Sequence, residues 1–330
     1  MKFSIVVPVF NRPDEVTELL DSLCKQTYKD FDVVIVEDGS TIKCDQITDK
    51  YSDKLSINYY FKENTGPGQT RNYGAERSSG DYIIFFDSDC IIPPAYMQTV
   101  SEQLQKKYID AYGGPDRAHP SFTPLQKAIN YSMTSFLTTG GIRGGKQKLD
   151  KFYPRSFNMG YSREVYNTTK GFSLMRFGED IDMSMRILKA GFKTALISDA
   201  YVFHKRRSNF RKFYKQVFNS GIARINLYKR HPELLKPVHT LPSMFLIGSL
   251  FLIMFSLFVS AYFILPLLFY IILLFLDSYQ KNKSTEVALL SIPAGFIQLC
   301  GYGAGFILSF WRRIVRGRPE FEAFQKNFYK

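Results

Sequence analysis

The sequence predicts an α/β protein with a mixed, mostly parallel sheet and helices on both faces, followed by C-terminal membrane helices. Short runs rich in Val and Ile alternate with segments of helical periodicity in the first part of the chain, which is typical of parallel sheets covered on both sides. Two later runs, 241–276 and 287–311, contain no Asp, Glu, Lys or Arg. Runs of this length are long enough to enter a lipid bilayer.

Strands are predicted where apolar runs end in polar or glycine-rich turns, and helices where apolar residues recur every three or four positions. Between 113 and 180 the pattern is irregular, and the glycine-rich, basic and aromatic segments there are expected to build or cover a site. The expected strands are FSIVVPVF (3–10), FDVVIVEDGS (31–40), INYYFKE (57–63, at a sheet edge), DYIIFFDSD (81–89) and KTALISDAYVFH (193–204). The expected helices are PDEVTELLDSLCKQ (13–26), GQTRNYGAERSSG (68–80) and a helix that starts at about Asp180.

The composition narrows the possible partners. Lys and Arg outnumber Asp and Glu by 43 to 30, which favours anionic partners such as nucleotide phosphates or an anionic membrane. No nucleic-acid-binding module is visible, so no nucleic-acid partner is expected. The four cysteines show no CxxC pair, and we expect free thiols in a reducing compartment. The start of the chain, MKFSIVVPVF, lacks the layout of a secretory signal.

Polar clusters follow three of the predicted strands, at 11–12, 37–40 and 87–89. In open α/β sheets, ligands bind beyond the carboxyl ends of the strands, so these clusters predict one shared site. Asp87 and Asp89 offer only oxygen ligands, which suit Mg²⁺ or Mn²⁺ and leave positions that a diphosphate can fill. The alternative for this pair alone is an ordinary aspartate turn cap.

The motifs SIVVPVFNR, EDGS, GPGQTRNYGAERSSGDYIIFFDSD and GEDIDMSMRI occur in this order. As a set, over about residues 3–230, they resemble the family 2 glycosyltransferases, which are inverting sugar-nucleotide enzymes with the GT-A (Rossmann-like) fold. The resemblance implies that Asp87 and Asp89 bind Mn²⁺ or Mg²⁺ on the donor diphosphate. It also implies that Asp180 is the catalytic base, with Glu179 as its acidic support. The alternative for the latter pair is an acidic helix N-terminus stabilised by the helix dipole.

The resemblance implies further site residues. The nucleotide would be bound by Pro8, Glu37, Asp38, Arg71 and Asp87. Asn158, Met159 and Gly160 resemble the segment that lines the donor sugar and acceptor. In some relatives a histidine at the position of His204 is a metal ligand, and the alternative here is an ordinary hydrogen-bonded strand end. The Gln-x-x-Arg-Trp motif of the processive members is missing, which favours transfer of a single sugar.

The chain is expected to divide into a glycosyltransferase domain (1–204), a basic amphipathic membrane-interface segment (205–240), a transmembrane hairpin (241–276) and a last part (277–330). This last part holds the second apolar run (287–311) and a basic tail. Residues 205–230 contain nine Lys or Arg and no acid, together with apolar residues at helical spacing, which favours an anionic membrane surface. The first run is too long for one comfortable span, so a bend near 258–266 is expected. The second run is expected to be re-entrant, interfacial or a short hairpin, with three full spans as the alternative.

The resemblance therefore implies inverting transfer of one sugar from a nucleoside-diphosphate sugar to a lipid-linked or surface-polysaccharide acceptor. A UDP-sugar is the favoured donor, and a GDP-sugar is the second choice. The expected location is the cytoplasmic membrane, multi-pass, with the catalytic domain facing the cytoplasm. The alternative is a non-catalytic, membrane-anchored, nucleotide-binding scaffold of a polysaccharide assembly complex. A channel or transporter is disfavoured because the two apolar runs contain no ionisable residue of the kind such proteins bury.

Overall fold

The computed structural model describes residues 1–140 and 153–321, and the chain forms two compact units. The first unit comprises Met1–Arg117 and the described part of Lys151–His204. The second unit comprises the described part of Ala118–Asp150 and Lys205–Glu320. The segment TTGGIRGGKQK, which was expected to help build a site, lies mostly outside the described residues.

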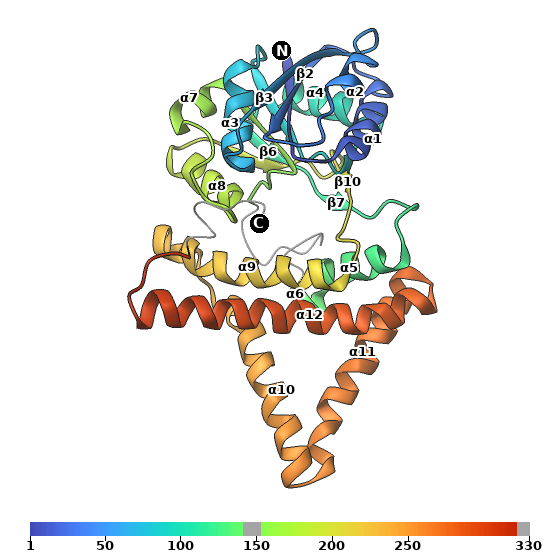
Figure 1. Ribbon diagram of the computed structural model, residues 1–330, viewed down its shortest axis with the longest axis vertical. Helices are drawn as coiled ribbons and strands as arrows, with labels where there is room; N and C mark the ends of the chain where they lie inside the picture. The colour runs from blue at the N-terminus through green and yellow to red at the C-terminus, as the bar shows by residue number, and fades with distance from the viewer. Residues whose placement is uncertain (141–152, 322–330) are drawn as a thin grey trace. The chain divides into compact units, whose positions relative to one another are not determined.

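A seven-stranded sheet runs through the first unit in the order β3-β2-β1-β4-β8-β6-β9 (Figure 1). Neighbouring strands are parallel, except that β8 is antiparallel to both β4 and β6. The predicted mixed, mostly parallel sheet is therefore confirmed, with β3 at an edge as expected. The strands are β1 (Phe3–Val9), β2 (Phe31–Asp38), β3 (Ser56–Lys62), β4 (Tyr82–Phe86), β6 (Ala111–Gly113), β8 (Asn158–Ser162) and β9 (Thr194–Leu196).

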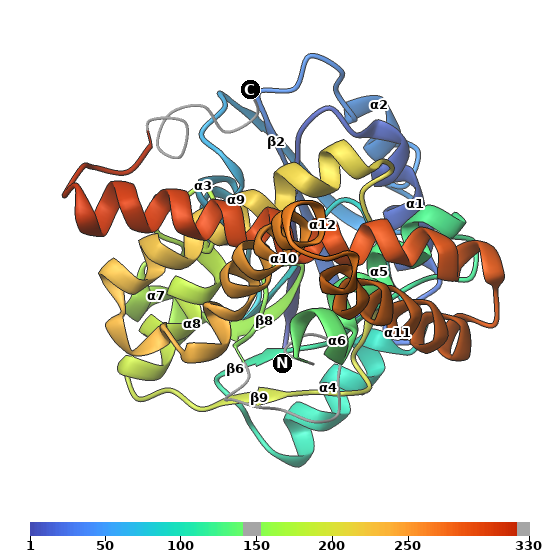
Figure 2. The same cartoon turned by 90° about the horizontal axis from the view of Figure 1, so that it is seen from below.

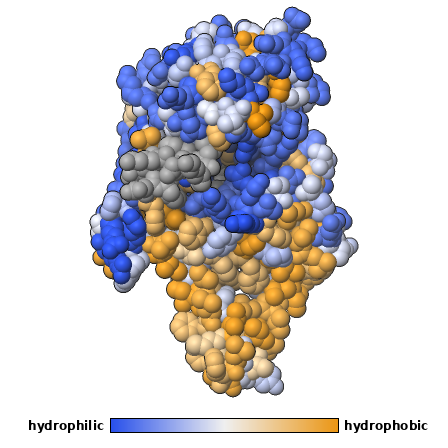
Figure 3. Space-filling model, viewed as in Figure 1, coloured by the Kyte–Doolittle hydropathy of each residue, from blue (hydrophilic) through white to orange (hydrophobic). Residues whose placement is uncertain are grey.

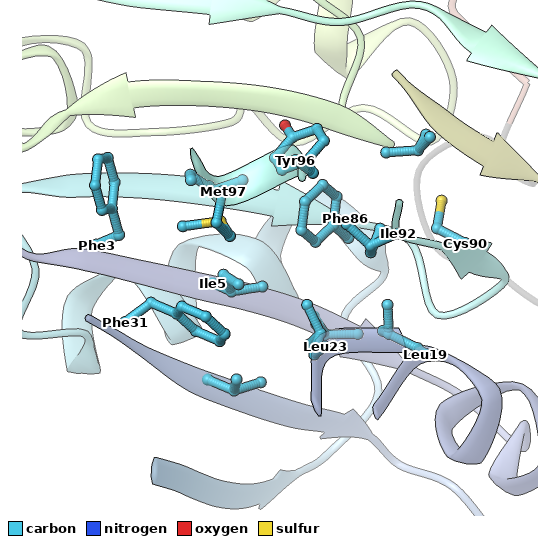
Figure 4. Packing of buried hydrophobic residues seen from close by; sticks show 14 of the residues in the cluster. Phe3, Ile5, Leu19, Leu23, Phe31, Phe86, Cys90, Ile92, Tyr96 and Met97 are labelled. Carbon is cyan, nitrogen blue, oxygen red and sulfur yellow. The ribbon is translucent and has the colours of Figure 1, made fainter. Parts of the chain in front are cut away.

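Helices cover both faces of this sheet, as predicted. On one face, Leu19 and Leu23 of α1 (Pro13–Cys24) join Ile5 of β1 and Met97 of α4 (Tyr96–Lys106) in one buried cluster (Figure 4). On the other face, the core includes residues of α3 (Pro67–Arg77), α7 (Arg163–Thr169) and α8 (Glu179–Lys189). A short α2 (Asp45–Asp49) follows β2.

The expected single strand over 193–204 is wrong. The chain turns after β9, where the Ala200 amide donates to the carbonyl of Ile197 over 3.1 Å. It then forms β10 (Val202–His204), which belongs to a separate three-stranded sheet in the order β5-β10-β7, with β5 (Cys90–Ile91) and β7 (Asp116–Arg117). Strand β8 was not predicted from the sequence, because Asn158 and Gly160 are poor strand formers. This strand nevertheless lies between β4 and β6.

The second unit is helical. The bend expected near 258–266 is confirmed, because α10 (Leu241–Phe258) and α11 (Leu265–Asn282) are joined by a short 3₁₀ turn, Ala261–Ile264 (Figures 1 and 2). The second apolar run forms one continuous helix, α12 (Thr285–Phe310), with Pro293 inside it, so the short hairpin that was one of the expectations for this run is wrong. The unit also contains α5 (Pro124–Thr134), α6 (Phe136–Thr139) and α9 (Phe210–Arg230).

The structure corrects one part of the prediction for residues 205–230. The apolar residues of this segment, which lie on α9, were expected to face the membrane because no partner within the protein was foreseen. Two of these residues, Phe213 and Val217, instead pack with Ala294 of α12 and with α5. The membrane-interface assignment of 205–240 stays a prediction, but its apolar face is covered by protein.

Arg163 joins the end of α3 to the start of α7. Its guanidinium donates to the carbonyls of Ala75 (2.6 Å), Ser78 (2.7 Å) and Gly80 (3.0 Å). Carbonyls at the end of a helix have no partner within the helix, so this one side chain satisfies acceptors that would otherwise lack one.

Replacing Arg163 with Met should lower the free energy of unfolding by about 2 kcal/mol, because charged hydrogen bonds to buried carbonyls are lost. The measurement is thermal and chemical unfolding of the purified full chain. Arg77→Met, on the exposed side of α3, should change the free energy by less than about 1 kcal/mol. Equal effects of the two substitutions would contradict this role of Arg163.

Candidate active site

The acidic pair Asp87 and Asp89 lies in a tight turn between β4 and β5. The amide of Cys90 donates to the carbonyl of Asp87 over 3.1 Å, which closes this turn. Each carboxylate has one oxygen on an arginine: Asp87 Oδ1 is 2.6 Å from Arg71 Nη2, and Asp89 Oδ2 is 2.7 Å from Arg12 Nη1. The pair therefore follows a rigid strand, and an arginine orients one oxygen of each carboxylate.

The second oxygens of both aspartates point to one imidazole nitrogen. His204 Nε2 lies 3.0 Å from Asp89 Oδ1 and 3.8 Å from Asp87 Oδ2. This position follows from the second sheet, in which His204 of β10 pairs directly with Cys90 of β5. The Phe157 ring stacks on the imidazole with centroids 4.9 Å apart, which fixes its plane. The structure therefore brings together the three predicted metal-binding residues.

Arg71 connects this cluster to the second acidic pair. Its Nη1 lies 3.3 Å from Glu179 Oε1 at the start of α8, while its Nη2 contacts Asp87. The side chain is only 4% exposed. Helix α3 brings Arg71 here by approaching the sheet closely, since a Cβ on Gly74 would lie 2.5 Å from Val6 Cγ1. Arg71 thus connects Asp87, a predicted metal-binding acid, to Glu179, the predicted support of the base.

Glu179 and Asp180 have different surroundings. Burial, and then the charge of Asp180, raise the pKa of Glu179 to about 7, while Arg71 opposes the shift. Asp180 instead faces Arg155, whose Nη1 lies 3.2 Å and 3.4 Å from its two oxygens. The amide of Ile181 donates to Asp180 Oδ1 over 2.8 Å. Asp180 thus has both carboxylate oxygens on Arg155, whereas Glu179 contacts Arg71 through one oxygen.

The loops after β1 and β2 are tied to each other. The side-chain oxygen of Asn11 accepts from the amides of Thr41 (2.8 Å) and Ile42 (2.9 Å), and the Asn11 amide donates to Ser40. Asn11 has a φ of 53°, a left-handed conformation that asparagine tolerates well. This connection fixes one wall of the predicted nucleotide region.

The predicted nucleotide residues at the end of β2 are fully buried. Asp38 accepts from the amides of Thr65 (2.9 Å) and Gly66 (2.8 Å) and from Lys62 Nζ. Glu37 accepts from the amide of Cys44 over 3.1 Å. These bonds order the segments at 44 and 62–66, and direct contact of either acid with a nucleotide stays a prediction. Pro8 is half-buried in β1, beyond the last residue that pairs with β4.

Asn158, Met159 and Gly160 lie in the core and not on a pocket surface. Asn158 is 0% exposed, accepts from the Tyr96 hydroxyl (2.5 Å) and donates to the Ala200 carbonyl (2.8 Å). Met159 is also fully buried, and a Cβ on Gly160 would meet the Tyr112 ring. The side chains of Asn158 and Met159 are therefore packed inside the core, and the lining role expected for this segment stays a prediction.

Sequence reasoning missed three cations that contact the predicted acids: Arg12, Lys62 and Arg155. Arg12 lies in a cluster that was noted after the first strand, but its partner Asp89 is far away in sequence. Arg155 lies in the basic, aromatic segment that was expected to build a site. Its position three residues before the start of a strand could not be recognised because β8 itself was missed.

Comparison with known families is consistent with this geometry. The family model described as glycosyl transferase family 2 matches residues 4–169, just over half of the chain. The chain belongs to glycosyltransferase family 2. A second model, described as glycosyl transferase family group 2, matches residues 157–276.

Curated relatives of this glycosyltransferase match over a limited segment. It is 36% identical over 114 residues to the poly(ribitol-phosphate) β-N-acetylglucosaminyltransferase TarS of Staphylococcus aureus, covering 33% of this chain and 20% of TarS. It is 36% identical over 110 residues to glycosyltransferase GlyA of Streptococcus pneumoniae, covering 33% and 16% of the two chains. The match thus spans about a fifth or less of these relatives' length.

Two solved structures share the fold of the glycosyltransferase. The mannosyltransferase PcManGT of Pyrobaculum calidifontis, in complex with GDP-Man and Mn²⁺, superposes with a TM-score of 0.63 at 14% identity and covers 88% of this chain and 85% of that chain. S. aureus TarS residues 1–349 superpose with a TM-score of 0.52 at 22% identity and cover 97% and 93%. These matches support the GT-A fold of the first unit.

The residues of this glycosyltransferase fit a divalent cation. Two carboxylate oxygens converge on the imidazole nitrogen of His204, and this mixed oxygen and nitrogen set suits Mn²⁺ better than Mg²⁺. Cys90 lies close to the same atoms, but burial raises the pKa of its thiol well above the usual value. Its Sγ donates to the Phe157 carbonyl over 3.7 Å. The protonated thiol is a poor ligand, which favours the two aspartates and the histidine.

Asp89→Asn and His204→Ala should each weaken Mn²⁺ binding by at least tenfold, because each removes a donor atom from the cluster. The measurement is calorimetric or EPR titration of Mn²⁺ into the purified full chain with UDP present. Cys90→Ala is the matched control and should leave the affinity unchanged. Unchanged affinity in His204→Ala would show that the imidazole only pairs with Asp89.

The raised pKa of Glu179 predicts a specific pH dependence of stability. A carboxyl group whose folded pKa is raised binds its proton more tightly in the folded state, so its stabilisation is present below the unfolded pKa of about 4.3. This stabilisation is lost as the pH rises toward the folded pKa of about 7.

The unfolding free energy of the wild type, relative to Glu179→Gln, should therefore fall between about pH 4.5 and 7. Denaturant unfolding of the metal-free chain across this window measures the difference. Glu164→Gln, which replaces an exposed acid in the first turn of α7, should give a constant difference. A constant difference for Glu179→Gln as well would contradict the raised pKa.

Proposed function

We propose that this glycosyltransferase transfers a single sugar, with inversion, from a nucleoside-diphosphate sugar to a lipid-linked or surface-polysaccharide acceptor. The observation that carries the proposal is the division of the acids in the first unit. Asp87, Asp89 and His204 form one cluster, Asp180 stands apart on α8, and Arg71 with Glu179 lies between them. An inverting transfer needs this division, with one carboxylate for the acceptor and others for the diphosphate.

The donor in this proposal is a UDP-sugar, with a GDP-sugar as the second choice. TarS has been solved with UDP-GlcNAc, and PcManGT with GDP-Man and Mn²⁺. TarS is also the relative with the higher sequence identity of the two, which favours the uridine nucleotide. Its name gives poly(ribitol-phosphate) as its acceptor, and a polymeric surface acceptor is one of the two acceptor classes proposed here.

In the proposed reaction, Asp180 accepts the proton of the attacking acceptor hydroxyl. Arg155 keeps both oxygens of Asp180 oriented until an acceptor hydroxyl approaches. Arg71 holds Asp87 toward His204 and carries positive charge next to the place where the diphosphate would lie. A divalent cation, when bound, would neutralise the charge that develops on the leaving diphosphate.

The proposed location is the cytoplasmic membrane, with the catalytic unit on the cytoplasmic side. Three helices of the described chain are long and apolar enough to cross a membrane. The four cysteines, all described, are free thiols, which fits a reducing compartment. Sugar nucleotides are cytoplasmic substrates, so this side supplies the donor.

Asp180→Asn should lower the transfer rate by about 10²–10⁴-fold, because the amide cannot accept the acceptor proton. Transfer is measured with the purified chain, Mn²⁺ and a panel of UDP- and GDP-sugars. Nucleotide binding, measured in parallel by calorimetry, should be retained. Glu164→Gln, which changes a helix-start acid away from the site, should keep the wild-type rate.

Two outcomes would overturn the proposal. Wild-type transfer by both Asp180→Asn and Asp89→Ala would remove the base and the metal pair from the mechanism. Nucleotide binding without turnover of any donor by the wild type would favour the non-catalytic scaffold.

A further inference from the structure

Helices α9 and α12 run in parallel, in contact over most of their length. Val217 lies beside Gly301, where an added Cβ would be 2.7 Å from Val217 Cγ2, and Gly221 lies beside Phe306. Further along, Arg313 Nη1 donates to Asn226 Oδ1 over 2.5 Å. Residue numbers therefore increase in the same direction along both helices from one contact to the next, and Figures 1 and 2 show the two helices side by side.

The two backbones touch at glycine. A Cβ on Gly305 would lie 2.0 Å from the Phe218 carbonyl oxygen, and one on Gly221 would lie 2.2 Å from the Tyr302 carbonyl oxygen. No lipid or water fits between surfaces this close. If α12 crossed a membrane, the adjoining part of α9 would therefore lie beside it at the same depth.

The face of α9 away from α12 is basic and exposed at the level of the middle of α12. Arg211, Lys212 and Lys215 are exposed, whereas Phe213 and Val217 in the same turns pack with Ala294, close to the midpoint of Thr285–Phe310. If α12 crossed the bilayer, these three cations would stand near its centre. Charged side chains at that depth are strongly unfavourable unless they are paired within the protein or face water.

The other side of α12 contacts both open ends of the α10–α11 hairpin. A Cβ on Gly303 would lie 2.5 Å from the carbonyl oxygen of Pro242, at the start of α10. Near the end of α11, Ser278 and Ser291 hydroxyls are 2.7 Å apart. Both ends of the hairpin therefore meet the same helix, while its closed end extends away from α12 (Figure 1).

The hairpin surface is apolar as far as its closed end (Figure 3). Leu257, Phe258 and Tyr262 are 73%, 83% and 79% exposed. The 18 residues of α10 extend about 27 Å, close to the hydrocarbon thickness of about 30 Å. Tyr262 at the closed end suits the far interface, where tyrosine is enriched.

We propose that only the α10–α11 hairpin crosses the membrane, and that α9 and α12 lie flat on its near surface. This inference rests on the membrane location proposed above. The basic face of α9 then contacts water and headgroups, the opposite side of α12 covers the hydrocarbon, and the segment after α12 stays on the side of α9. The chain therefore crosses twice, although three of its helices have the length and composition of spans.

The test maps sidedness with single cysteines in the full chain. The background is Cys24→Ser with Cys300→Ala, because Cys44 and Cys90 are 0% and 1% exposed and should not react in the folded protein. The reporters are Lys229→Cys at the end of α9, Val259→Cys at the hairpin turn, Glu286→Cys at the start of α12 and Arg318→Cys beyond its end. All four positions are exposed, and none belongs to the candidate active site.

A membrane-impermeant maleimide is added to right-side-out and to inside-out vesicles, and labelling is read as a gel shift. We expect the cysteines at 229, 286 and 318 to react from one side and the cysteine at 259 from the other. Labelling of 286 and 318 from opposite sides would overturn the flat placement of α12. Labelling of 259 from the same side as 229 would overturn the crossing of the hairpin.

The parent background without a reporter is the control and should give no shift. Recovery of the chain in the soluble fraction would refute the membrane premise itself. Sugar transfer is measured separately in detergent, so failure of the topology and failure of the enzymatic proposal are distinguishable.

Discussion

The candidate site depends on the two ion pairs made by the buried guanidinium of Arg71. This guanidinium is nearly inaccessible to water and is shared between Asp87 and Glu179. A buried cation in such a place requires partners, because removing one of them leaves an uncompensated charge. The two acidic pairs, which lie on different elements, are therefore held at a fixed separation. The close packing of α3 against the sheet at Gly74 fixes the position of this arginine.

Much of the first unit could be predicted from local patterns. β1, β2 and β4 are largely apolar runs, and the polar residues at or just after their ends lie at the carboxyl edge of the sheet, as parallel pairing requires. The failures arise where tertiary contacts override local preference. Asn158 reads as a turn residue, yet its amide is satisfied by Tyr96 and the Ala200 carbonyl, so a strand forms there. The role of β10 in placing His204 beside Asp89 depends on a pairing that no local pattern signals.

The second unit shows a different limit of sequence reasoning. Hydropathy identified the apolar runs and the position of the hairpin bend, because these depend only on local composition. It could not identify what covers the apolar stripe of α9. That partner is α12, and one glycine on each helix, Gly221 of α9 and Gly305 of α12, allows direct backbone contact. Pro293 and several glycines give α12 a low helix propensity, so local preference predicts a break there. Packing of α12 on neighbouring helices offsets this low propensity.

The charges around Asp87 and Asp89 are partly balanced within the protein. Asp87 faces Arg71, Asp89 faces Arg12, and both carboxylates approach His204. Cations next to two neighbouring carboxylates offset the repulsion between them, so the turn can hold both acids side by side. Each arginine contacts one oxygen of its aspartate, and the other oxygen of that aspartate is the one nearest His204. The two arginines therefore determine which carboxylate oxygens are presented on the side of the imidazole.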